Sequence, residues 1–155
     1  MKNIWDAERV RPWVIHWIYG VVIGHLAVGI LLPWISALSM FDAYHRSVES
    51  GFWSHGAPAE ARSQQVWWIS LFGPTAQVLA IWMGALIRIG DLHRSTFVWN
   101  WLIIGVIVWA PQDMMVSLRA GAWIHVWVDY FALITMLPPL IWLRGYDRIH
   151  PQLKY

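Results

Sequence analysis

The chain has 155 residues, of which 58% are hydrophobic and only 13% charged, and its net charge is +2. This balance excludes an ordinary soluble domain and predicts an integral membrane protein. The basic residues lie at the ends of apolar runs, which argues against nucleic-acid binding, and the lack of cysteine excludes disulfides and thiolate metal ligands.

The apolar runs predict four membrane-spanning helices. No Ala-x-Ala cleavage pattern follows the first run, so we expect a retained helix rather than a signal peptide. The mixed polar residues 42–65 are expected to form the only long loop. Each run is long enough to cross a hydrocarbon core of about 30 Å, and the spans are predicted at residues 13–37, 66–87, 97–118 and 122–143. The expected fold is all-α: a single transmembrane domain, residues 1–155, built as a four-helix bundle.

The basic residues predict how this bundle is oriented. Three of them, Arg46, Arg62 and Arg119, fall on the side of the long loop. The other side carries eight: Lys2, Arg9, Arg11, Arg88, Arg94, Arg144, Arg148 and Lys154. Because cytoplasmic segments are enriched in Lys and Arg, we expect both termini in the cytoplasm and the loop 42–65 outside, in a bacterial inner membrane.

His25 lies near the middle of the first span, in the run Val-Val-Ile-Gly-His-Leu-Ala-Val-Gly-Ile-Leu-Leu-Pro-Trp. Gly24 precedes it, and Pro33 and Trp34 follow it by eight and nine residues. This spacing resembles the membrane helix of purple-bacterial light-harvesting β polypeptides. That resemblance implies that His25 binds the magnesium of a pigment and that Trp34 donates a hydrogen bond to a ring substituent of the same pigment. The other interpretation is a structural hydrogen bond between His25 and Gln77 of the second span.

Three ionisable residues, Asp113, His125 and Asp129, fall inside or at the edge of the last two spans. Charged groups are costly in hydrocarbon, so such residues usually pair or face a wet interior. Counting outward from a turn near residues 119–120 places Asp113 and His125 at similar depth on antiparallel helices. Asp129 follows His125 by four residues and therefore shares its helix face. The spacing predicts a polar cluster.

Aromatic and amide side chains predict a pocket around this cluster. Most of the 14 tryptophans lie near predicted helix ends, as membrane-interface residues do. Trp109 and Trp127 lie deeper and flank the cluster in sequence. Pro74 and Pro111 each leave a backbone carbonyl without its helical partner, which favours a hydrated or ligand-filled cavity. The expected ligand-binding residues are Trp109, Trp127, Gln77, Gln112 and His25.

Asp113, His125 and Asp129 are the catalytic candidates, because a neutral histidine facing carboxylates can act as a general acid and base. Aromatic rings nearby can stabilise a developing cation. These features suggest isomerase or cyclase chemistry on a lipophilic, sterol- or terpenoid-like substrate that enters from membrane lipid. The layout is similar to that of the emopamil-binding and sigma-2 receptor family, with four or five helices, a long non-cytoplasmic loop after the first, and acidic and histidine residues in an apolar pocket. This is a similarity of layout, so no residue role is carried over.

Three other interpretations stay open. Asp113, His125 and Arg119 can form a structural salt-bridge network that closes the hairpin. His125 and Asp129 can instead ligate copper or zinc together with loop residues, for which the candidates are Asp42, His45 and His55. The chain can also be a non-catalytic subunit that binds a pigment, a quinone or a partner helix in an electron-transfer or photosynthetic complex, or a homo-oligomer. The sequence assigns neither a cofactor nor a metal.

Overall fold

The computed structural model describes residues 3–151, with side chains from residue 8 onward, and the regular secondary structure in this part of the chain is all helical. The elements are α1 (Asn3–Ile35), a short 3-10 helix η1 (Ser39–Phe41), α2 (Asp42–Phe52), α3 (Ala59–His93), α4 (Thr96–Arg119) and α5 (Trp123–Ile149). Four of them, α1, α3, α4 and α5, are long and apolar enough to cross a membrane. The prediction of an all-helical fold with four long apolar helices, each able to span a membrane, is confirmed for the described residues.

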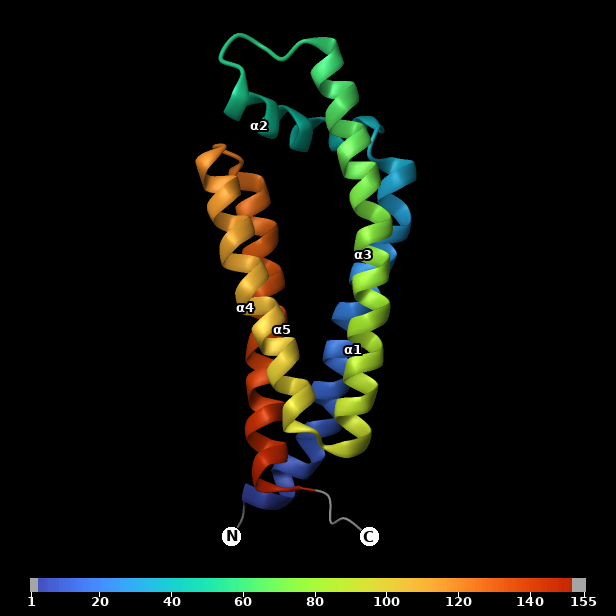
Figure 1. The fold of residues 1–155 in the computed structure, drawn as a ribbon, viewed down its shortest axis with the longest axis vertical. Coiled ribbons are helices and arrows are strands. Elements are labelled where there is room, and N and C mark those ends of the chain that lie inside the picture. The colour runs from blue at the N-terminus through green and yellow to red at the C-terminus, as the bar shows by residue number, and fades with distance from the viewer. Residues whose placement is uncertain (1–2, 152–155) are drawn as a thin grey trace.

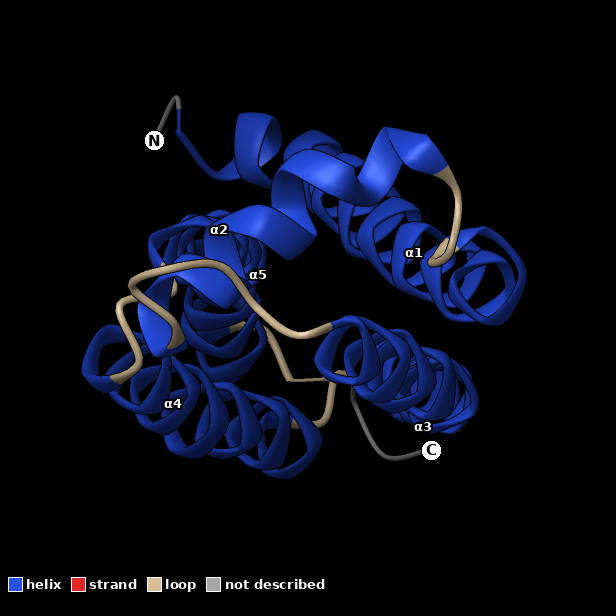
Figure 2. Cartoon of the chain, turned by 90° about the horizontal axis from the view of Figure 1, so that it is seen from above, coloured by secondary structure: helices blue, strands red, loops and turns tan. Residues whose placement is uncertain are grey.

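The four long helices form two pairs. α1 packs chiefly on α3, and α4 packs chiefly on α5 (Figure 1). The pairs lie close together at the end where α1 begins and α5 ends, which we call the terminal end. They diverge toward the opposite end, where α2 crosses above them (Figure 2). We call that opposite end the α2 end.

Small residues set the spacing within the α1–α3 pair. A Cβ atom on Gly73 would lie 2.7 Å from the carbonyl oxygen of Gly29 and 2.6 Å from the ring of Pro33. Only glycine therefore fits at this helix crossing, as is common where membrane helices approach closely. The side chain of Gln77 donates a hydrogen bond of 3.0 Å to the Gly29 carbonyl. Gln77 is thus used in helix pairing and does not bond His25.

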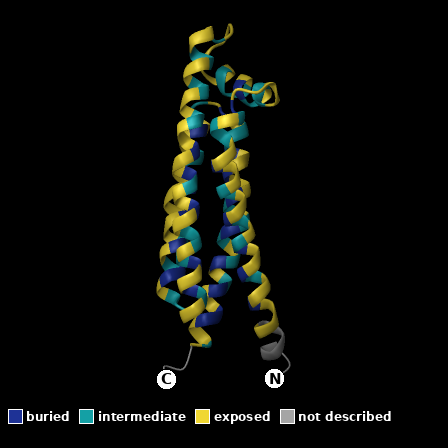
Figure 3. Ribbon diagram, turned by 90° about the vertical axis from the view of Figure 1, so that its right-hand side faces the viewer, coloured by how far each residue is buried: buried dark blue, intermediate teal, exposed yellow. Residues whose placement is uncertain are grey.

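The apolar core lies in the half of the molecule near the terminal end (Figure 3). All four long helices contribute to it. Its largest fully buried side chains are Ile18 of α1, Ile87 of α3, Trp99 of α4, and Leu140 and Leu143 of α5. The two helix pairs are thus packed together by a common core near the terminal end.

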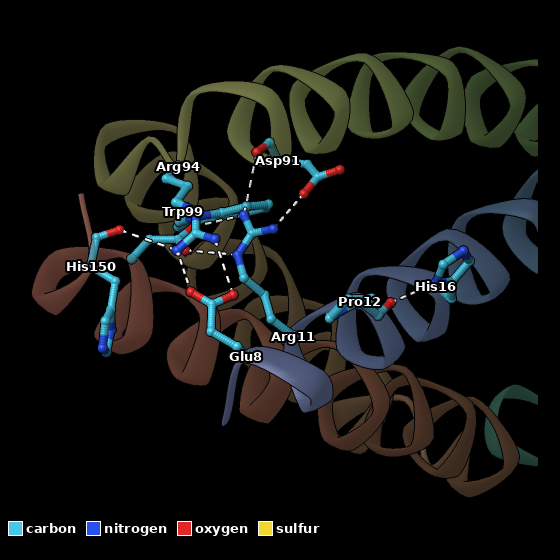
Figure 4. A network of polar contacts seen from close by, with 9 residues as sticks. Glu8, Arg11, Pro12, His16, Asp91, Arg94, Trp99 and His150 are labelled. Atoms are coloured by element: carbon cyan, nitrogen blue, oxygen red, sulfur yellow. Dashed lines mark hydrogen bonds and ion pairs between the residues drawn. The ribbon is translucent and has the colours of Figure 1, made fainter. Parts of the chain in front are cut away.

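Charged side chains add to this contact (Figure 4). Arg11 of α1 is 7% exposed and donates two hydrogen bonds to the carboxylate of Asp147 in α5, at 2.8 and 3.1 Å, and one to the carboxylate of Asp91 in α3, at 2.6 Å. The indole N–H of Trp99 in α4 donates to Asp147 at 2.8 Å. Arg11, Asp91, Trp99 and Asp147, which we call the terminal network, join all four long helices at one point.

The segment 42–65 differs from the predicted loop, because α2 fills its first half and α3 already begins at Ala59. Arg62 of α3 forms ion pairs with Asp42 and Glu49 of α2. The hydrogen bond from Arg62 holds the pKa of Glu49 below its usual value. The buried His45 donates through Nε2 to the Ser36 carbonyl at 2.7 Å. These contacts tie α2 to the α1–α3 pair, and we did not foresee a helix here because so short and polar a segment has little tendency to be helical alone.

Candidate functional site

The turn between α4 and α5 brings the predicted cluster together. Gly121 occupies the turn with a φ of 69°, a conformation that glycine adopts readily. His125 Nε2 lies 3.5 Å from Asp113 Oδ1 on α4 and 3.8 Å from Asp129 Oδ1 on α5. The predicted proximity of Asp113, His125 and Asp129 is therefore confirmed, and we call these residues the α4–α5 cluster.

Burial differs sharply within the cluster. The side chain of Asp129 is only 3% exposed, whereas those of Asp113 and His125 are 31% and 32% exposed. The second carboxylate oxygen of Asp129, Oδ2, is buried and has no hydrogen-bond partner. A buried carboxylate oxygen without a partner destabilises the folded protein unless it binds a proton or a cation. The cluster thus combines a buried carboxylate, one oxygen of which lacks a hydrogen-bond partner, with two accessible groups.

Two aromatic residues hold the accessible groups. The hydroxyl of Tyr44 on α2 lies 3.3 Å from His125 Nδ1, and Trp109 donates through its indole N–H to Asp113 Oδ2 at 3.1 Å. Burial raises the pKa of the Tyr44 phenol, and the charges of Asp129 and Asp113 raise it further, so the phenol stays neutral. Tyr44 was missed in the sequence because its position depends on α2. The one indication was its place near the start of the segment that follows the first span.

Trp127 and Gln112 lie away from the cluster. Trp127 follows His125 by two residues, which turns it about 200° around the helix. It is 64% exposed and packs against Tyr130. Gln112 is exposed and donates to the Val108 carbonyl of its own helix at 2.7 Å. Their predicted roles in ligand binding stay predictions, now without a contact to the cluster.

His25 is half-buried in α1, and its Nδ1 lies 2.8 Å from the carbonyl oxygen of Val21. His16 makes the same kind of contact with Pro12 one helical turn back, at 2.6 Å. Because an ordinary helix histidine does this too, the contact does not mark His25 as a pigment ligand.

Arg119, which we considered as a partner of the cluster, is exposed at the end of α4. The ion pairs that the described residues form with Asp113 and Asp129 come from His125. The structural network of Asp113, His125 and Arg119 considered above therefore lacks its arginine in this arrangement.

No family model, curated protein or solved structure matches the chain. The geometry of the cluster must therefore carry the functional argument alone.

One open depression lies elsewhere, on the surface of the α4–α5 pair near the terminal end. Its volume is about 330 Å³, and its lining consists of Asn100, Ile103, Ile104, Ile141 and Arg144. Isoleucines line it rather than the expected tryptophans, and it is remote from the α4–α5 cluster along both helices.

Proposed function

We propose that the chain is an integral membrane enzyme that moves a proton on a lipophilic, sterol- or terpenoid-like substrate at Asp113, His125 and Asp129. The observation that carries the proposal is the buried carboxylate of Asp129, which faces His125 and is paired with no lysine or arginine among residues 8–151. Purely structural ion pairs usually balance their charges and satisfy their hydrogen bonds. A site with an uncompensated carboxylate beside a histidine is instead typical of proton transfer.

The residues have distinct roles in this proposal. His125, as an imidazolium stabilised by the Asp129 carboxylate, donates a proton to one carbon of a substrate double bond, which leaves a carbocation. The neutral imidazole then takes a proton from the carbon on the other side of the cation, so the double bond shifts with no gain or loss of atoms and no oxidant. Tyr44 orients the ring through Nδ1. Positioned acid–base groups of this kind contribute about 10²- to 10⁴-fold to rate.

The exposure of the cluster supports access from lipid. Asp113 and His125 keep about a third of their side-chain surface open, within helices that hydrocarbon would surround. We place the cluster in the outer leaflet of a bacterial inner membrane, with both termini in the cytoplasm, because the terminal end carries the excess of basic residues. The alternative, a pigment- or quinone-binding subunit, has no comparable observation in its favour.

Deuterium incorporation tests the proposal without knowledge of the substrate. Purified protein is incubated in D₂O with a total lipid extract of its native membrane, and the lipids are analysed by mass spectrometry. We expect one neutral lipid species to gain deuterium at a carbon position. The rate should fall at least about 100-fold in His125→Ala and in Asp129→Asn.

His55→Ala is the matched control, because His55 is an exposed histidine of the same end of the molecule. This variant should keep the full rate. Asp113→Asn provides a second site variant that leaves no buried group unpaired. Absence of incorporation by the unaltered protein, or equal rates in folded His125→Ala and His55→Ala, would refute the proposal.

A further inference from the structure

The distances within the α4–α5 cluster fit a shared metal ion better than hydrogen bonds. Separations of 3.5 and 3.8 Å from His125 Nε2 to the two carboxylates exceed those of ordinary charged hydrogen bonds. Two ligands bound to one zinc ion at about 2.1 Å and a tetrahedral angle lie about 3.4 Å apart. One ligand atom from each of the three residues lies within 4.8 Å of the others. We infer that Asp113, His125 and Asp129 bind one divalent transition-metal ion of the zinc class.

The unpartnered oxygen of Asp129 is a second, independent observation. Only 3% of the Asp129 side chain is exposed, and its Oδ2 has no hydrogen-bond partner. Two carboxylates and one imidazole converge here with no arginine paired to them in residues 8–151. A bound divalent cation cancels this charge and gives the buried carboxylate its missing partner.

The surrounding hydrogen bonds leave the right atoms free. The Tyr44 oxygen can accept the Nδ1 proton of His125, which leaves Nε2 with a lone pair toward the two carboxylates. Trp109 donates its hydrogen bond to Asp113 Oδ2, so Asp113 Oδ1 stays free and faces His125. Metal-binding histidines and carboxylates usually have such outer partners, which fix their tautomer and orientation. Tyr44 and Trp109 are therefore positioning residues for the ion.

The donor set selects the kind of ion. One imidazole nitrogen favours zinc and its neighbours over magnesium or calcium, which prefer six or more oxygen ligands. Three protein ligands leave a fourth position for water, as in catalytic zinc sites. Zinc-bound water loses a proton near neutral pH and would then take the substrate proton in place of His125. This catalytic consequence rests on the proposed function, whereas binding of the ion does not.

Metal analysis of the purified protein tests the inference. The protein is stripped with chelator, dialysed against Zn²⁺ and analysed by elemental mass spectrometry, and Co²⁺ provides an absorption spectrum of the site. We expect about one zinc per chain, and visible Co²⁺ bands of tetrahedral intensity. Asp113→Asn and His125→Ala should lose the zinc, and Tyr44→Phe should weaken affinity about 10- to 100-fold.

Asp42→Asn and His55→Ala are the controls, because these two loop candidates do not belong to the group of described residues whose ligand atoms come together, and Asp42 is paired with Arg62 instead. Both should keep the zinc. Asp113 is accessible, so its replacement by Asn should preserve the fold, which the elution volume verifies. Absence of zinc from the unaltered protein, or equal zinc in folded Asp113→Asn and Asp42→Asn, would overturn the inference.

The two proposals fail in different ways. If stripped protein binds no zinc yet incorporates deuterium at the full rate, the metal inference is wrong and the proposed function stands. If the protein binds stoichiometric zinc but incorporates no deuterium, the metal inference stands and the proposed function is wrong.

Discussion

Replacement of Asp147 by asparagine tests whether the terminal network holds the two helix pairs together. Asp147 is 1% exposed and accepts hydrogen bonds from Arg11 and from the indole N–H of Trp99. Asparagine keeps the shape of the side chain and can still accept from Trp99. The substitution therefore removes one buried negative charge and leaves Arg11 with Asp91 as its only carboxylate partner.

The expected loss follows from the burial of the pair. The substitution removes a buried charged hydrogen bond from Arg11, which costs about 1.5–3 kcal/mol, while Asp91 still balances the charge of the arginine. For a chain of this size, 1 kcal/mol corresponds to about 2–4 °C in Tm. Asp147→Asn should therefore lower Tm by about 3–12 °C.

The matched control is Glu8→Gln, which removes a carboxylate at the same end of the molecule. Glu8 is paired with Arg94 at 3.1 Å, and its side chain is 46% exposed. An exposed pair contributes only about 0–1 kcal/mol, so Tm should fall by less than about 4 °C. Both variants are measured by tryptophan fluorescence in the same detergent. Equal losses in the two variants would show that burial of Arg11 and Asp147 does not stabilise the protein.

Two further predictions concern α2. A Cβ at Gly51 would collide with the carbonyl oxygen of Ala120. Gly51→Ala should therefore destabilise the packing of α2 against the α4–α5 turn by about 1–3 kcal/mol and speed the hydrogen exchange of α2. Gly105→Ala, where a Cβ meets nothing within 4 Å, should leave that exchange unchanged. Arg62 holds the pKa of Glu49 below 4.5, so the stability from this pair is complete above that pH and is lost as pH falls through the lowered pKa. Cleavage of segment 53–58 by pepsin, measured relative to an unstructured peptide at the same pH, should therefore rise with acidification, and Glu49→Gln should remove this relative rise.

The sequence was sufficient to predict the α4–α5 cluster, because the three residues of the cluster lie close together along the chain. A short turn fixes the depth at which Asp113 meets His125, and helical periodicity places Asp129 beside it. The same periodicity places Trp127 on the opposite face, which its nearness in sequence to His125 concealed. Local spacing therefore predicted the cluster better than it predicted the pocket around it.

Contacts between distant helices could not be derived in this way. Arg11 and Asp147 are separated by 136 residues, and the sequence offered no register that would pair them. Arg11 was interpreted only as a determinant of membrane orientation. The one indication was that Asp91 and Asp147 lie at helix ends that are otherwise rich in arginine. Carboxylates in such places are available to pair with the arginines.

Two helix pairs fastened at one end behave mechanically as a pair of lever arms. The 24 residues of α4 span about 36 Å, so a rotation of about 5° at the terminal network displaces the far end by about 3 Å. Tyr44 lies on α2, which is tied to the α1–α3 arm by the ion pairs of Arg62 and also contacts the α4–α5 arm. His125 lies on the α4–α5 arm, so the 3.3 Å contact between Tyr44 and His125 is one of the links across the open end. Because membrane helices respond to bilayer thickness by tilting, we expect a thinner or thicker bilayer to change the length of this contact.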